Sequence, residues 1–149
     1  MKVLPLRRPR EEALGGMMLG ASEVRLDLQG PIDDLRLLKS DLEAYYWERP
    51  DDGELQERQR YQMRLWMRQV GERTAALEDI LMHMGTPTVV VSVASTAEAE
   101  TLRDAVTVFG RWVREGEPFD DVLRSVAVVL STADMLWLRA AGGRPDGGV

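Results

Sequence analysis

Apolar residues recur at three- and four-residue spacing in two stretches of the first half of the chain, and this spacing predicts two amphipathic helices. The first helix begins at Gly30-Pro31, and the proline-glycine segment at residues 50–53 ends it. The second runs from about Glu54 to Met84, and Gly85 ends it. A short connection makes the two antiparallel neighbours, with facing pairs Leu35 and Val70, Leu38 and Met67, and Leu42 and Met63. The second helix is longer, so its second half must pack on another element.

The second half of the chain predicts another antiparallel helical hairpin. Ser95 and Glu98 have the spacing of a capping box, which places a helix start there, and Gly116 ends this helix. Pro118 then opens a fourth helix. In an antiparallel hairpin, the residue numbers of any two facing residues add up to the same value. Four apolar pairs share one such value: Val113 with Val122, Phe109 with Val126, Val106 with Val129, and Leu102 with Ala133. This sum places the turn at Glu117.

Two short segments have the pattern of strands. Residues 24–28 alternate apolar and polar side chains, and residues 88–93 are rich in β-branched residues. We expect the two segments to pair. The predicted fold class is therefore mainly α, with four helices in two antiparallel αα-hairpins and two or three short β-strands as a minor component.

The length of 149 residues fits a single domain. We predict a flexible basic arm at residues 1–20, which holds Lys2, Arg7, Arg8 and Arg10. Residues 21–141 form the helical domain. Residues 142–149 are glycine-rich and carry no helix or strand pattern, so we predict a flexible tail.

Composition excludes several classes of protein. The chain has no cysteine, which removes disulfides, thiolate nucleophiles and cysteine-bound metals. Its start lacks the apolar core of a secretory signal, and no apolar stretch is long enough to span a bilayer. Abundant arginine with only two lysines suggests a GC-rich genome, so we expect a bacterial or phage protein that is soluble and cytoplasmic. The net charge of −6 disfavours non-specific binding to nucleic acid.

Candidate chemistry is sparse, and we predict no catalytic, cofactor-binding or metal-binding residues. His83 is the only histidine, which leaves a catalytic triad or a histidine-rich metal site without its members. Two acidic pairs, Glu54 with Glu57 and Glu117 with Asp120, have spacing that suits Mg²⁺ in a small nucleotide-handling enzyme. Both lie at helix starts, where the helix dipole stabilises acids without a ligand. The enzyme therefore stays an alternative.

Three arginines, Arg60, Arg64 and Arg68, line one face of the second helix. Each four-residue step rises about 6 Å, which is close to the spacing of phosphates along a nucleic-acid strand. A nucleic-acid-binding protein is therefore a second alternative. Because the chain is acidic, we favour a solvated face on which Glu57 and Glu72 pair with these arginines.

The C-terminal hairpin carries more apolar residues than its own seam requires. The extra residues also pair at the same sum, as Trp112 with Leu123, Val108 with Ala127, and Ala105 with Leu130, which suggests one broad apolar face. The long second helix, the small sheet or another chain must cover it. We therefore predict a non-enzymatic interaction or assembly protein that binds another protein or itself as a homo-oligomer, through Val108, Trp112, Leu123, Ala127, Leu130 and Trp137.

Overall fold

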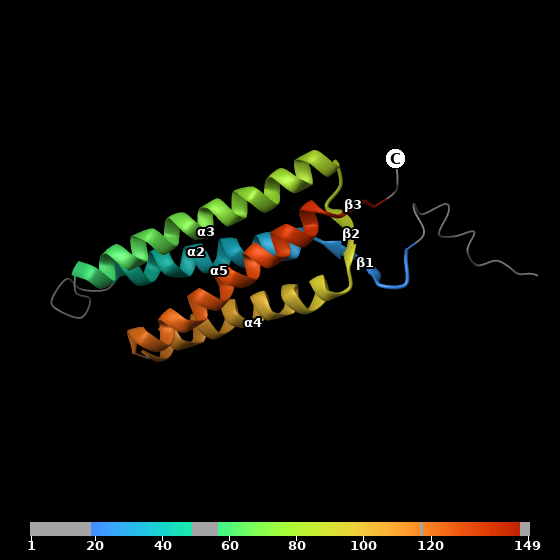
Figure 1. Cartoon of the computed structure of the whole chain (residues 1–149). Coiled ribbons are helices and arrows are strands. Elements are labelled where there is room, and N and C mark those ends of the chain that lie inside the picture. Colours follow the sequence, from blue (N-terminus) through green and yellow to red (C-terminus); the bar gives the residue numbers. More distant parts are fainter. Residues whose placement is uncertain (1–18, 49–56, 117, 147–149) are drawn as a thin grey trace, which may run out of the picture.

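The computed structural model describes residues 19–48, 57–116 and 118–146, and this part of the chain is mainly helical. Four α-helices account for 78% of it and are accompanied by a small antiparallel sheet, so the predicted fold class is confirmed. The elements follow the order β1 (Glu23–Asp27), α2 (Gln29–Glu48), α3 (Glu57–Met84), β2 (Thr88–Ser92), α4 (Ala94–Glu115), α5 (Phe119–Ala141) and β3 (Arg144–Pro145). Figure 1 shows the helices side by side, with the strands at one end of the bundle.

The first hairpin is formed by α2 and α3, and its predicted apolar stripes are buried. Asp27 accepts a hydrogen bond from the backbone N–H of Gln29 at 2.9 Å, which satisfies one free donor at the start of α2. The second half of α3 packs on α5, as its extra length requires. Arg73 joins the two helices, since its guanidinium donates to the carbonyl of Leu130 at 3.3 Å and to Asp134 at 3.0 Å. The buried stripes are Leu35, Leu38 and Leu42 on α2, with Met63, Trp66, Val70 and Leu77 on α3.

The second hairpin, α4 with α5, confirms the seam that the constant sum predicted. Its seam residues are fully or partly buried, and Phe109 is the largest fully buried side chain among the described residues. Gly116 ends α4 in the left-handed conformation, at φ 73°, which only glycine adopts without strain. The predicted turn residue, Glu117, lies outside the described residues.

The predicted capping box at the start of α4 is wrong. The Oγ atom of Ser95 is buried and has no hydrogen-bond partner among the described residues. Ser92 takes its place, since its Oγ accepts from the backbone N–H of Ala94 at 3.3 Å. Glu98 instead pairs with Arg139 of α5 at 2.7 Å. The N-cap residue is Val93, so the helix begins two residues earlier than the box requires and Ser95 already faces the core.

The strands form a three-stranded antiparallel sheet in the order β1-β2-β3. The predicted pairing of the first two strands is confirmed, with Leu26 opposite Val89. Because side chains alternate along a strand, Val24, Leu26, Val89 and Val91 share one face, which packs on the core of the bundle. Glu23, Arg25, Val90 and Arg144 share the opposite face.

The prediction that the segment after residue 141 contains no strand is wrong. Arg144 and Pro145 pair with Val90 and Val89 of β2, and the N–H of Asp146 donates to the carbonyl of Thr88 at 3.1 Å. The two-residue strand β3 was invisible to a pattern search, because alternation needs at least four residues to be recognised. The predicted basic arm, apart from residues 19 and 20, lies outside the described residues.

Candidate functional site

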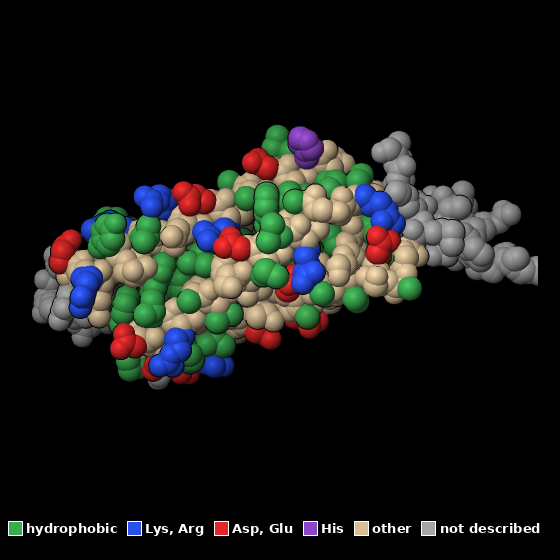
Figure 2. All heavy atoms as spheres, viewed as in Figure 1, with side chains coloured by type: hydrophobic (Ala, Val, Ile, Leu, Met, Phe, Trp, Pro, Cys, Tyr) green, Lys and Arg blue, Asp and Glu red, His purple; other side chains and the backbone are tan. Residues whose placement is uncertain are grey.

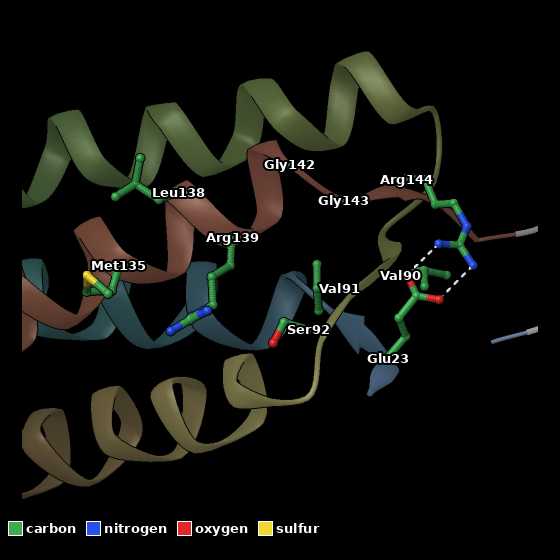
Figure 3. A pocket seen from close by; sticks show the side chains of 10 residues that line it. All are labelled: Glu23, Val90, Val91, Ser92, Met135, Leu138, Arg139, Gly142, Gly143 and Arg144. Carbon is green, nitrogen blue, oxygen red and sulfur yellow. Dashed lines mark hydrogen bonds and ion pairs between the residues drawn. The ribbon is translucent and has the colours of Figure 1, made fainter. Parts of the chain in front are cut away.

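A pocket of about 460 Å³ opens where the end of α5 meets the sheet. Figure 3 shows Met135, Leu138 and Arg139 of α5 on one side of it and the Glu23–Arg144 pair on the other. Val90, Val91, Ser92, Gly142 and Gly143 complete the wall. This size and mixture of apolar and polar walls are typical of binding sites.

Two ion pairs lie on the outer face of the sheet, and one of them, Glu23 with Arg144, lines this pocket. Arg144 donates to both carboxylate oxygens of Glu23, at 2.6 and 3.0 Å, and Arg25 donates to Asp146 at 2.9 Å. These hydrogen bonds from Arg144 lower the pKa of Glu23 and raise the pKa of Arg144 itself. The pairs flank Val90, which is buried although it lies on the face opposite the bundle core. The charged side chains thus cover the apolar side chain of Val90.

Gly143 allows the chain to pass close to β2 at the rim of the pocket. A Cβ atom at this position would lie 2.5 Å from the carbonyl oxygen of Val90 and 2.9 Å from a methyl carbon of Val91. No side chain fits there without displacing the backbone. Nothing in the sequence indicated this contact, because a glycine before a turn is common.

The polar groups that line the pocket are engaged by neighbouring residues. Arg139 pairs with Glu98, Arg144 pairs with Glu23, and the Ser92 hydroxyl caps α4. No histidine lies beside Ser92 to act as a base, because His83 lies on α3 and lines a different pocket. The pocket can accept an apolar side chain between Met135 and Leu138, with hydrogen bonds at its charged rim.

The six predicted interface residues do not form one face, so the predicted broad face is corrected. Val108 and Trp112 of α4 line a groove of about 220 Å³ with Arg124, Ser125 and Val128 of α5. Trp137 lies on the other side of α5, in a pocket of about 330 Å³ formed with Ile80, His83 and Met84 of α3. Leu130 lies on that side as well, because its carbonyl accepts from Arg73 of α3.

The constant-sum rule explains this error. When both helices are viewed from one end of the hairpin, a step backward on one helix and a step forward on its antiparallel neighbour turn the side-chain direction in the same sense around each axis. Because the two helices face each other, this rotation carries the two side chains to opposite sides of the hairpin. The rule therefore holds along the seam, at Phe109 and Val126, and fails for Trp112 and Leu123. Among the six residues, Leu123, Ala127 and Trp137 are exposed, while Val108, Trp112 and Leu130 are partly buried.

The predicted pairing of the α3 arginines with acids is confirmed for two of them. Arg64 lies 3.4 Å from Glu57, and Arg68 lies 4.0 Å from Glu72. Arg64 also donates to the Tyr46 hydroxyl at 2.7 Å, a contact that the sequence did not predict. The guanidinium of Arg60 stacks over the Tyr46 ring, 5.5 Å from its centre.

The remaining candidates are not brought together in the described residues. Glu57 lies in the first turn of α3 and Asp120 in the first turn of α5, whereas Glu54 and Glu117 lie outside the described residues. No group of three or more histidine, aspartate or glutamate side chains able to hold a metal ion occurs within residues 19–48, 57–116 and 118–146. None of the helices in these ranges is both long and apolar enough to cross a membrane.

Comparison with known proteins adds no assignment to this geometry. No protein family, curated protein or solved structure matches the chain.

Proposed function

We propose that this chain is a non-enzymatic interaction protein that self-associates through the outer face of α5. The observation that carries the proposal is the exposed apolar stripe of Val128, Met135 and Leu138 on α5. A helix packed on one side of a core needs one apolar stripe, and the fully buried Leu136 supplies it here. Val128, Met135 and Leu138 lie outside this buried stripe and are 43%, 43% and 59% exposed. Figure 2 shows hydrophobic side chains on the face of the molecule where α5 lies.

The chemistry of α5 favours a second copy of the same chain as the partner. The helix begins with Asp120 and Asp121 and carries Arg139 in its last turn. In a two-fold contact, α5 lies antiparallel to its copy, so the acidic start of one helix faces the basic end of the other. The exposed Ser131, midway between these ends, is small enough for a close approach of the two helices.

The size of the apolar face predicts a weak dimer. Complete burial of a large apolar side chain contributes about 1.5–3 kcal/mol, so a side chain that is already half buried adds about 1 kcal/mol. Val128, Met135 and Leu138 from both copies together give about 6 kcal/mol, which association costs reduce. We therefore expect a dissociation constant above about 10 µM. The pocket beside Leu138 offers a further anchor point at the end of the contact.

Light scattering coupled to size exclusion tests the proposal over a protein concentration series. The wild type should exceed the monomer mass of 16.8 kDa at high concentration and approach it on dilution. Leu138→Glu should stay monomeric, because it places a charge in the contact. Leu37→Glu is the matched control, since Leu37 is 53% exposed but lies on α2. A wild type that stays at 16.8 kDa up to millimolar concentration would refute self-association.

A further inference from the structure

A row of aromatic and arginine side chains lies where α2 ends and α3 begins, at the end of the bundle opposite the sheet (Figure 1). Trp47 packs edge-on against Tyr46, with ring centres 4.8 Å apart. Tyr46 in turn binds Arg64, whose guanidinium also lies 6.0 Å from the centre of the Tyr61 ring. The row Trp47, Tyr46, Arg64 and Tyr61 is thus continuous across the two helices.

The two outer rings of this row are open to solvent. Trp47 is 75% exposed and Tyr61 is 60% exposed, whereas Tyr46 between them is buried. Exposed aromatic rings at the two ends of this row offer flat faces on which bases can stack. Neither ring is needed to fill the core, since Trp66 and Met63 fill it on α3.

The row is positively charged although the chain as a whole is acidic. Residues 57–69 of α3 contain four arginines, at positions 58, 60, 64 and 68, against a single acid, Glu57. Tyr46 holds the guanidinium groups of Arg60 and Arg64 against one ring, at 5.5 and 6.0 Å from its centre. An anion that approaches this ring therefore meets two guanidinium groups.

The acids that now face these arginines can be displaced. Glu57 lies 3.4 Å from Arg64 and is almost fully exposed, and Glu72 lies 4.0 Å from Arg68. Exposed pairs at these distances contribute little to stability. The Tyr46 hydroxyl, in contrast, holds Arg64 in place at 2.7 Å, so the cation stays oriented when Glu57 leaves.

We propose that this surface binds single-stranded nucleic acid, with bases stacked on Trp47 and Tyr61 and backbone phosphates bound by Arg64 and Arg68. The spacing suits a polymer, because one helical turn separates the two arginines by about 6 Å along the axis. An anionic ligand with flat faces satisfies both the guanidinium groups and the exposed rings. The site is independent of the proposed dimer contact on α5.

Fluorescence anisotropy with a labelled twelve-nucleotide oligouridine tests this site on the full chain at low salt. Binding should weaken as salt rises, and the salt dependence should fall by about one phosphate contact in Arg64→Gln. Loss of one stacked base in Trp47→Ala should weaken binding at least about fivefold. The matched control is Arg124→Gln, because Arg124 is an exposed arginine of α5 that pairs with Asp121 at 3.2 Å.

Circular dichroism melts separate loss of binding from loss of fold, and Trp47→Ala removes a side chain that the core does not use. Three results would overturn the proposal. One is no binding at 100 µM protein in low salt. Another is an equal loss in Arg124→Gln. The third is tighter binding of a polyglutamate peptide than of oligouridine, which would identify an acidic protein segment as the ligand.

Discussion

Replacing Gly143 with alanine tests the closest backbone approach in the sheet. The added Cβ would lie 2.5 Å from the carbonyl oxygen of Val90, 2.9 Å from a methyl carbon of Val91 and 3.3 Å from the carbonyl oxygen of Ala140. Two of these three neighbours are backbone atoms, which cannot rotate away. The chain at Gly143 must therefore move outward and separate β3 from β2.

The neighbouring Gly142 provides a matched control. A Cβ there would lie no closer than 3.7 Å to another atom, which is ordinary contact, and its φ of −88° suits any residue. Both substitutions reduce the freedom of the unfolded chain by the same amount, so that effect cancels between them. The remaining difference is the cost of overpacking, about 1–3 kcal/mol. For a chain of this length it corresponds to a Tm difference of roughly 2–12 °C.

Urea unfolding and thermal melts of the two variants measure this difference. Gly143→Ala should unfold at lower urea and lower temperature, and hydrogen exchange at Val90, which pairs with Arg144 of β3, should accelerate before the helices open. Gly142→Ala should match the wild type or exceed it slightly. If the two variants are equally stable, β3 does not pack on β2 as closely as described, and the reasoning fails.

Two further substitutions test contacts that the sequence either missed or predicted wrongly. Ser95→Ala should leave the free energy of unfolding unchanged or raise it by up to about 1 kcal/mol, because it removes a buried hydroxyl without a partner. If urea unfolding instead shows a loss of about 1 kcal/mol, Ser95 does cap the helix. Arg144 holds the pKa of Glu23 below its ordinary value of 4.5, so the ionised carboxylate stabilises the fold above that pH and this contribution disappears as the pH falls through the lowered pKa. The difference in Tm between wild type and Glu23→Gln should therefore be largest near neutral pH and should disappear below pH 4.5. A difference that increases in acid would contradict this prediction.

The sequence predicted those parts of the fold that depend on repetition along the chain. Stripes such as Leu35, Leu38 and Leu42 repeat over several turns, so they fix both the helix and its buried side. The seam between Phe109 and Val126 followed from the same repetition, because one register satisfied four pairs at once. The ends of helices at Gly85 and Gly116 were also predictable, since both adopt a left-handed conformation that favours glycine.

The parts that the sequence could not predict depend on contacts between distant single residues. Glu23 and Arg144 are 121 positions apart, and nothing in either neighbourhood identifies the other as its partner. The same holds for Tyr46 and Arg64, which the pairing of α2 and α3 brings into contact. The six predicted interface residues were wrongly assigned to one face, because the sum of two residue numbers gives their level along the hairpin and not their side of it.

The order of the sheet also has a consequence for the synthesis of the chain. The central strand, β2, is translated well before its neighbour β3, and both helices of the second hairpin must emerge between them. Until residues 144–146 leave the ribosome, the outer face of the sheet lacks Arg144 and Asp146, and Val90 stays exposed to solvent on that face. A nascent chain therefore exposes an apolar strand edge, while the local contacts within each hairpin can already form. The sheet is therefore completed only when residues 144–146 are available, and a pause before them prolongs the period in which β2 can pair with the wrong chain.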